Sequence, residues 1–281
     1  MKSQAQGNMK TKKNDTKRVF LKKGACSHTF FYILNREFGY LKDDAEKASD
    51  PLSGGLDQEG YQCGMLWGAA LGAGAEAFRK YEDSTLATAQ AVIATQSILE
   101  SFIRRTGSAN CAVITECDFN SKFGLAKYLL SGKPIKCFML ADKWAPEAIE
   151  SSKRGLSKAL PELSVTPVSC ASEDVKKMGG NLEESVMVSG FAGGMGLSGN
   201  ACGALAAAIW MITLRKVKED NYKFVMNDPE TQKLKEIFLE ETDYKMECRK
   251  ICGREFKTIS EHTEFINQGG CGRLIDLLGK M

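Results

Sequence analysis

The chain has 281 residues, 43% of them hydrophobic, which is enough to bury a full core and to build two ordinary domains. Its net charge of +3 is unevenly distributed: residues 1–23 hold eight Lys and Arg and one Asp, so the remainder carries 30 basic and 34 acidic residues. The first segment therefore predicts a basic, disordered tail. The mildly acidic body has no basic motif interleaved with aromatic residues, which predicts no nucleic-acid partner.

Helical patterns follow one another along the first half of the sequence. In chain order they predict helices over residues 27–38, 43–49, 63–81 and 86–105, short helical pieces near 112–130, and a last helix after Pro134 that holds Cys137. Asp83 or Ser84 can cap the fourth of these helices, and Gly107 ends it. Because alternating apolar and polar runs are scarce, we expect an all-α fold.

The second half repeats this order and contains one segment that resembles a membrane span. Residues 186–214 form an uncharged stretch that is longer than a bilayer helix requires. Their middle is the glycine-rich run GGMGLSGN, which breaks a helix. We therefore expect a buried core helix over residues 201–214 and no membrane insertion. A long charged helix is predicted over residues 229–248 and a final one over 272–278.

Two stretches of the chain are alike. Residues 54–64 read GGLDQEGYQCG and residues 193–203 read GGMGLSGNACG, and both lead into an alanine-rich apolar helix. Similar segments follow in both copies, NCAVITECDF and ECRKICGREF. This internal repeat predicts two tandem, pseudo-symmetric helical domains, residues 24–152 and 165–281, each with a glycine-rich turn leading into a buried helix.

Ten cysteines are the most informative residues of the chain. No apolar stretch follows the positive charges at the start, so we expect no export signal and a cytoplasmic location. In a reducing compartment, clustered thiols are more often metal ligands or redox groups than disulfides. Eight of the cysteines form two ordered sets of four: Cys26, Cys63, Cys111 and Cys137, then Cys170, Cys202, Cys248 and Cys271.

Cys117 and Cys252 fall outside these two sets. At helical spacing they could line the same face as the cysteine that precedes them, or they could pack in the core. Taken singly, any of the ten cysteines is compatible with a small buried apolar residue.

The glycines around Cys63 and Cys202 suggest how a reactive thiol could arise. Gly60 and Gly199 permit a tight turn directly before a helix. The cysteine would then lie in the first turn, where free N–H groups and the helix dipole favour a thiolate and lower its pKa. We expect all four of these glycines, Gly60, Gly64, Gly199 and Gly203, to lie against a cofactor, and Gly64 and Gly203 would allow it or another helix to approach closely. Three cations could support the negative charge: Lys136, Arg249 and Arg273.

Several types of site are excluded by the residues that are missing. His28 and His262 are the only histidines, and no CxxC pair or phosphate-binding GxxxxGK[ST] loop occurs. His28 lies two residues after Cys26 and could be a ligand, a proton donor or a packing residue. Four cysteines could hold a 2Fe–2S or 4Fe–4S cluster, hold a structural zinc, or cycle between dithiol and disulfide, with Cys63 and Cys202 as the redox thiols.

The second copy resembles a known family. Residues 190–209 (GFAGGMGLSGNACGALAAAI), the upstream Cys170, and the segments ECRKICG and GGCGRLIDLL resemble the C_GCAxxG_C_C redox-active proteins, which are named for four cysteines and a glycine–cysteine motif. A related domain accompanies split-Soret cytochromes, in which an iron–sulfur cluster has been proposed. Family members usually hold one copy, so the resemblance implies a tandem duplication. The motif departs from the family at Ala207, in place of glycine, and at Met65.

Together these features predict a redox protein that transfers electrons through iron–sulfur clusters held by the two cysteine sets. The alternatives are a metal-free thiol–disulfide oxidoreductase or redox sensor, and a structural or zinc-binding accessory protein. If the protein is an enzyme, it is an oxidoreductase. The expected partner is another redox protein, and a homodimer is compatible with the sequence.

Overall fold

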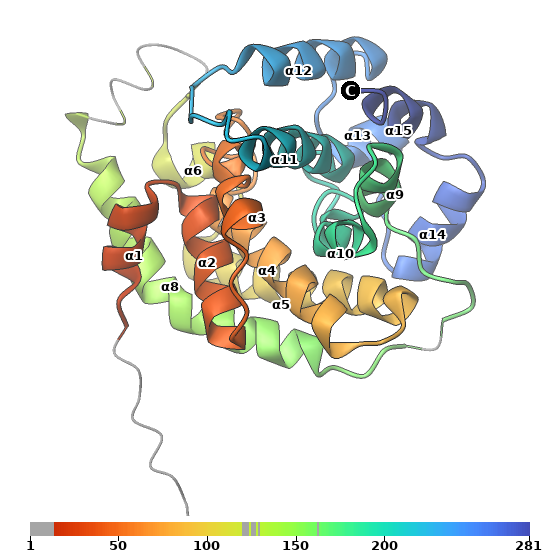
Figure 1. Ribbon diagram of the computed structural model, residues 1–281, viewed down its shortest axis with the longest axis horizontal. Coiled ribbons are helices and arrows are strands. Elements are labelled where there is room, and N and C mark those ends of the chain that lie inside the picture. The colour runs from red at the N-terminus through yellow and green to blue at the C-terminus, as the bar shows by residue number, and fades with distance from the viewer. Residues whose placement is uncertain (1–13, 120–123, 125–127, 129, 162) are drawn as a thin grey trace, which may run out of the picture.

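The computed structural model describes residues 14–119, 124, 128, 130–161 and 163–281, and it is all-helical, as predicted (Figure 1). The described residues contain no strand, only two isolated bridges, Gln62 with Asn110 and Ala201 with Glu247. The first half consists of α1 (Thr16–Lys23), α2 (Cys26–Phe38), α3 (Asp43–Lys47), η1 (Asp50–Leu52), α4 (Gly64–Lys80), α5 (Ser84–Thr106), α6 (Cys111–Thr115) and α8 (Lys133–Leu156).

The second half repeats the order of the first. In both, a helix that starts with a cysteine is followed by a glycine-rich turn, a long buried helix and a short helix that again starts with a cysteine. The second half consists of α9 (Cys170–Lys177), α10 (Leu182–Met187), η2 (Ser189–Phe191), α11 (Gly203–Lys218), α12 (Pro229–Glu241), α13 (Cys248–Cys252), α14 (Ile259–Asn267) and α15 (Gly272–Leu278).

Local signals set most helix ends. The Asp83 side chain accepts a hydrogen bond from the Thr85 amide at 2.8 Å, and Gly107 ends α5 in the left-handed conformation, with φ of 76°. Helix α10 has a capping box, in which the side chains of Asn181 and Glu184 bond each other's backbone amides. The predicted ends of α5 are therefore confirmed to within two residues.

Two predictions differ from the structure. The charged helix expected over residues 229–248 stops at Glu241, because Asp243 and Tyr244 adopt positive φ angles of 50° and 59° and turn the chain back. Cys248 consequently starts a separate helix, α13. The segment predicted as a disordered tail, residues 1–23, ends in a helix instead: residues 16–23 form α1, which packs against α2 and α8 and buries Val19 and Phe20.

The long helices α4 and α11 interlock the two halves. Helix α4 packs against α2 and α5 of its own half and also against α10, whereas α11 packs against α9 and also against α3 and η1. A Cβ atom at Gly74 of α4 would lie 2.3 Å from the Met187 carbonyl oxygen, so only glycine permits this contact. Conversely, Trp210 of α11 donates to the Ala45 carbonyl at 3.0 Å.

Further contacts join the halves in one hydrophobic core. The rings of Trp67 and Phe191 meet edge to face, with centroids 4.7 Å apart. The buried side-chain amide of Gln62, the residue before Cys63, donates to the Gly194 carbonyl at 3.0 Å. The glycine-rich turn of the second half therefore contacts the first half next to its second cysteine. In Figure 1 the second half, coloured green to blue, lies across the upper right of the first.

The uncharged segment 186–214 is divided between α10, η2, a run of turns and α11. Almost every residue of α11 from Gly203 to Leu214 is buried, which confirms the predicted core helix. Within the described residues, one helix is long and apolar enough to cross a membrane by length and composition, α5, and 72% of its apolar window is buried inside the protein.

Candidate redox site

In both halves the backbone pairs the segment before the second cysteine with the segment before the third. In the first half the Cys63 amide donates to the Ala109 carbonyl at 2.8 Å, and the Cys111 amide donates to the Tyr61 carbonyl at 2.6 Å. The bridge between Gln62 and Asn110 is part of this pairing. It holds the starts of α4 and α6, and therefore Cys63 and Cys111, side by side.

The second half reproduces this pairing residue for residue. The Cys202 amide donates to the Met246 carbonyl at 2.8 Å, and the Cys248 amide donates to the Asn200 carbonyl at 2.7 Å. The bridge between Ala201 and Glu247 corresponds to the first-half bridge. The match between the two cysteine sets, inferred from their order along the chain, thus extends to the backbone geometry of the second and third cysteines.

The glycine-rich turns direct amides at the first cysteine of each half. The Gly54 amide donates to the Cys26 sulfur, and the equivalent Gly193 amide donates to the Cys170 sulfur. Both glycines have positive φ, 68° and 58°, which an L-residue rarely adopts. The GG pair of each repeat is therefore explained by a backbone turn that supplies an N–H···S hydrogen bond.

The four glycines predicted to approach a cofactor approach protein atoms. A Cβ atom at Gly64 would lie 2.5 Å from the Cys26 sulfur, and one at Gly203 would lie 1.9 Å from the Phe191 carbonyl oxygen. Gly60 and Gly199 have φ of 77° and 70° and face the short cysteine helices α6 and α13. These glycines make space for the sulfurs and the segments that carry them, and their contact with a cofactor stays a prediction.

All five cysteines of the second half line one apolar cavity. Cys252 is central: its sulfur lies 3.9 Å from the Cys248 sulfur and 3.6 Å from the Cys271 sulfur. The open space between the side chains is about 10 Å³, roughly that of one water molecule, so the sulfurs pack against one another. Besides Cys248, Cys252 and Cys271, the lining consists of Cys170, Cys202, Gly203, Ala204, Ile251, Phe256, His262, Phe265, Ile266 and Leu274.

The thiols of the first half also lie close enough to one another to affect each other's pKa. The Cys26 and Cys63 thiols are hydrogen-bonded to each other, and the charge of Cys26 acts on both Cys111 and Cys137. Cys117, 4% exposed, is close enough to act on the same two thiols. Each half thus gathers the four predicted cysteines and one more.

Cys117 and Cys252 are the residues that sequence reasoning left outside the two sets. For Cys252 a signal existed, because residues four apart on a helix share a face and Cys248 begins α13. The same spacing argument was made for Cys117, but the helix that begins at Cys111 ends at Thr115, so Cys117 lies beyond it. It follows Glu116, whose left-handed backbone, with φ of 52°, ends α6 and turns the chain back.

Neighbouring thiols and burial oppose the thiolates expected at Cys63 and Cys202. The hydrogen bond with Cys26 and burial raise the pKa of the Cys63 thiol, and burial raises the pKa of the Cys202 thiol. Backbone amides at the starts of α4 and α11 do bond these sulfurs, as expected, but burial outweighs them. Two of the three predicted cations are also engaged elsewhere: Arg249 pairs with Glu247 at 2.9 Å and Arg273 pairs with Glu241 at 2.8 Å, whereas Lys136 lines a hollow together with Cys137.

The thiol pKa is lowered at Cys26 instead. The hydrogen bond with Cys63 lowers it to about 7, against the effect of burial, and the Ser53 hydroxyl and the Gly54 amide add further hydrogen bonds. Cys26 is the first residue of α2, where free amides favour negative charge.

The Nδ1 atoms of both histidines lie near protein oxygens. His28 Nδ1 lies 3.0 Å from the Asp50 carboxylate, which also accepts from the Tyr222 hydroxyl at 3.2 Å. His262 lines the second cavity, and its Nδ1 lies 3.3 Å from the Val168 carbonyl oxygen. Burial lowers the pKa of His262 to about 4, so its imidazole is neutral. Tyr128 occupies the same place in the first half, nine residues before the last cysteine of the set, and hydrogen-bonds the Cys137 sulfur.

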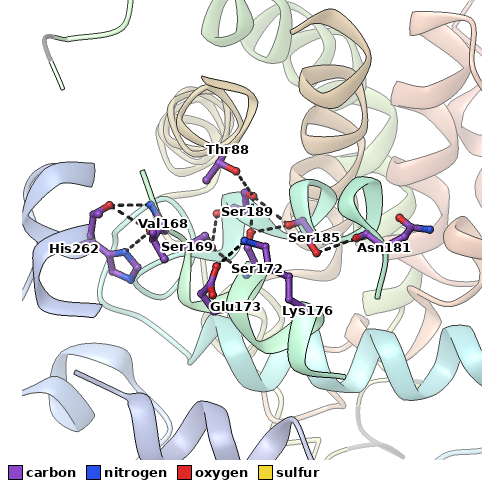
Figure 2. A network of polar contacts seen from close by, with 11 residues as sticks. Thr88, Val168, Ser169, Ser172, Glu173, Lys176, Asn181, Ser185, Ser189 and His262 are labelled. Atoms are coloured by element: carbon purple, nitrogen blue, oxygen red, sulfur yellow. Dashed lines mark hydrogen bonds and ion pairs between the residues drawn. The ribbon is translucent and has the colours of Figure 1, made fainter. Parts of the chain in front are cut away.

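A buried hydroxyl network fixes the helix that carries Cys170 (Figure 2). Ser172 of α9 donates to the Ser185 carbonyl at 2.6 Å and shares a 2.7 Å hydrogen bond with the Ser189 hydroxyl. Ser189 also bonds Thr88 of α5 at 3.4 Å. The network ties α9 to α10, η2 and the first half, and so sets the position of the Cys170 sulfur.

Each cysteine cluster also reaches the surface at its fourth cysteine. A hollow of about 330 Å³ between α6 and α8 exposes Cys137 beside Lys136 and Val113. A hollow of about 270 Å³ exposes Cys271 and Cys252.

Within the residues that the structure describes, no three side chains of His, Cys, Asp or Glu are arranged to hold a single metal ion.

Comparison with known proteins agrees with the internal repeat. The model of a family described as "Putative redox-active protein (C_GCAxxG_C_C)" matches the chain twice, over residues 25–145 and 169–281. Each match contains one full set of four cysteines, so the predicted tandem duplication is confirmed. No curated protein and no solved structure matches the chain.

Proposed function

Since this chain belongs to the C_GCAxxG_C_C family of redox-active proteins, in two tandem copies, we propose that it transfers electrons through an iron–sulfur centre in each half. The proposed ligands in the first half are Cys26, Cys63, Cys111 and Cys137. Those in the second half are Cys170, Cys202, Cys248 and Cys271.

The observation that carries this proposal is the convergence of these thiols from four separate segments in each half. Cysteine sulfur is the ligand that iron–sulfur clusters prefer. N–H···S hydrogen bonds, such as those from Gly54 and Gly193, stabilise negative charge on the ligand sulfurs and raise the reduction potential of such centres. The donor set and its hydrogen bonds therefore fit a cluster.

The surroundings of the thiols suit electron transfer. Apolar side chains such as Phe256, Phe265 and Leu274 line the second cavity and exclude water, which protects a cluster from hydrolysis and lowers the local dielectric. The hollows at Cys137 and Cys271 bring one ligand of each half to the surface. A partner redox protein that docks there would come within a short distance of each centre.

The test is purification of the full chain without oxygen, with assays for iron, zinc and acid-labile sulfide and a visible spectrum. We expect iron and sulfide in matching amounts, with charge-transfer absorbance. Cys63→Ser and Cys202→Ser should each remove the centre of one half only. Zinc alone would indicate a structural metal site, and neither metal nor sulfide in the anaerobic preparation would refute the proposal.

A second candidate function is metal-free dithiol chemistry at Cys26 and Cys63. The observation that favours it is the hydrogen bond between these two thiols, which holds the Cys26 pKa at about 7, a value typical of reactive cysteines. The same anaerobic preparation distinguishes the two. A colourless protein in which Cys26 and Cys63 are reversibly oxidised to a disulfide would support this alternative.

A further inference from the structure

Two cysteine sulfurs lie in contact at the floor of a surface hollow in the second half. The sulfurs of Cys252 and Cys271 are 3.6 Å apart, and both residues are partly exposed. The hollow has a volume of about 270 Å³, which is at the lower end for small-molecule sites. Its rim carries a charged pair, Arg273 with Glu241, at 2.8 Å.

The backbone places both thiols at special positions. Cys271 has a left-handed conformation, with φ of 57°, in the sequence Gly-Gly-Cys-Gly. An L-residue rarely adopts this conformation, and such strain concentrates at functional sites. Cys252 is the last residue of α13 and is followed by Gly253, with φ of 66°. Two turns therefore bring the thiols together from segments nineteen residues apart.

Cys252 is not one of the four repeated cysteines, so its place is not explained by the site that the two halves share. Its first-half counterpart, Cys117, is 4% exposed. Two thiols of the second-half cluster, Cys252 and Cys271, therefore also line a surface hollow, through which a small molecule can reach them.

We propose that Cys252 and Cys271 form a thiol–disulfide exchange site for low-molecular-weight disulfides that carry carboxylate and ammonium groups. The guanidinium of Arg273 fits a carboxylate and the carboxylate of Glu241 fits an ammonium group. The inference goes beyond the proposed electron transfer and does not depend on it. The two uses of Cys271 exclude each other in one molecule, since a disulfide-bonded Cys271 cannot ligate a centre.

The exchange balances in two steps. A hydrogen bond with a neighbouring thiol, together with burial, raises the pKa of both Cys252 and Cys271, so each cysteine must lose its proton as it reacts. The sulfur of one cysteine then attacks a sulfur of the substrate disulfide, forms a mixed disulfide and releases one substrate thiolate, which takes up the proton that the cysteine lost. The second cysteine, as a thiolate, then attacks the protein sulfur of the mixed disulfide. This step forms the Cys252–Cys271 disulfide and releases the second substrate thiol with the second proton. The protein is oxidised by two electrons and the substrate disulfide is reduced by two.

The test uses the full chain, freed of metal with a chelator, reduced, and then treated with glutathione disulfide as the probe. Trypsin separates the three cysteines of this region, because it leaves Cys248 in peptide 246–249, Cys252 in peptide 251–254 and Cys271 in peptide 258–273. We expect the first protein disulfide to link the last two peptides. A first disulfide between any other pair, or no exchange in the folded chain while the denatured chain reacts, would overturn the inference.

Three variants sharpen this experiment. C252S and C271S should each lose the protein disulfide, and at least one of them should retain glutathione on the remaining cysteine. C117S is the matched control, because it removes the equivalent but buried cysteine, and it should react at the wild-type rate. R273A should slow the reaction with glutathione disulfide by about tenfold, as expected for a lost charge-assisted hydrogen bond, but not that with uncharged hydroxyethyl disulfide. Equal rates for C252S and wild type would contradict the site.

Iron and sulfide assays on the untreated protein keep the two proposals apart. Exchange at Cys252 and Cys271 in a chain that never contains iron would leave this site in place and remove the proposed function. An iron–sulfur centre in a chain that does not react with glutathione disulfide would support the proposed function and refute the exchange site.

Discussion

Cys26 has a thiol pKa of about 7, mainly because of its hydrogen bond with Cys63. In the metal-free, reduced chain, Cys26 should therefore be half ionised near neutral pH. Its rate of alkylation by iodoacetamide should rise about tenfold per pH unit below pH 7 and level off above it, since the thiolate is the nucleophile. The rate can be followed by the mass of tryptic peptide 24–36.

Two variants of the partner residue test the cause of this low pKa. Cys63→Ala removes the hydrogen-bond donor and should move the midpoint of the pH–rate curve upward, whereas Cys63→Ser keeps a donor and should move it less. A midpoint that stays in place in Cys63→Ala would show that the amides of α2 and the glycine turn, rather than Cys63, set the pKa.

Asp174 is buried one helical turn after Cys170, and neither of its carboxylate oxygens has a hydrogen-bond partner among the described residues. Burial raises its pKa well above the usual value, which Lys177 offsets only in part. A raised folded-state pKa stabilises the fold at pH values below the unfolded pKa of about 4, and this contribution is lost as the pH rises. Asp174→Asn should therefore increase the free energy of unfolding at pH 7, by roughly 1–3 kcal/mol.

The gain from Asp174→Asn should shrink as the pH falls towards 4, because wild-type Asp174 is then protonated in both states. Chemical denaturation at several pH values measures this difference. Asp276→Asn is the control, since Asp276 is an exposed partner of Lys177 and should change little. If Asp174→Asn raised the free energy of unfolding equally at pH 4 and pH 7, the gain would not come from removing a buried, ionised carboxylate.

At this scale, sequence reasoning predicted which cysteines belong together but not their ionisation. The order of the cysteines identified both sets of four. It could not show that burial would outweigh the helix amides at Cys63 and Cys202, because burial depends on packing between distant segments.

Single helices were predictable where the signals are local. The Asp83 cap and Gly107 fixed the ends of α5, because capping depends on a few neighbouring residues. The break after α12 was not predictable. Asp243 and Tyr244 adopt left-handed conformations so that Cys248 can pair with the Asn200 carbonyl, a contact 48 residues away in sequence.

Gly203, the first residue of α11, tests how closely this helix packs against η2. A Cβ atom at Gly203 would lie 1.9 Å from a backbone oxygen, that of Phe191, which cannot move independently of η2. Gly203→Ala should therefore cost roughly 1–3 kcal/mol of unfolding free energy and displace Cys202, with loss of the second centre. Thermal unfolding and the metal content of the second half are the measurements.

Gly272→Ala is the matched control for this change. Gly272 also lies in the first turn of a helix beside a cysteine, but a Cβ atom there would meet nothing within 4 Å. Alanine should be neutral or slightly stabilising at this position. Equal effects of the two substitutions would show that helix propensity, and not the contact with Phe191, explains the glycine.

The whole molecule depends on contacts that the repeat alone could not reveal. The apolar composition of α4 and α11 indicated buried helices, because a helix that is hydrophobic all round must be covered on every side. It did not indicate what covers them. In the structure each is covered partly by the other half, through Gly74 against Met187 and through Trp210 against Ala45.

This interlocking predicts that neither half folds alone, although each contains a complete family match. Residues 14–165 would expose the face of α4 that packs on α10, including Trp67, which is fully buried in the whole chain. Residues 166–281 would lose the cover of α3 and η1 on α11. Burial of each large apolar side chain contributes about 1.5–3 kcal/mol, so losing several of them exceeds the usual margin of stability.

Expression of the two segments, separately and together, measures this dependence. Alone, each should lack a cooperative unfolding transition by circular dichroism. Together they should associate into one folded complex with the helicity of the intact chain, because the contacts between the halves form in the same way without the connecting segment. A cooperative transition in either segment alone would show that each copy is an independent domain, and that the second copy was added to a fold already complete.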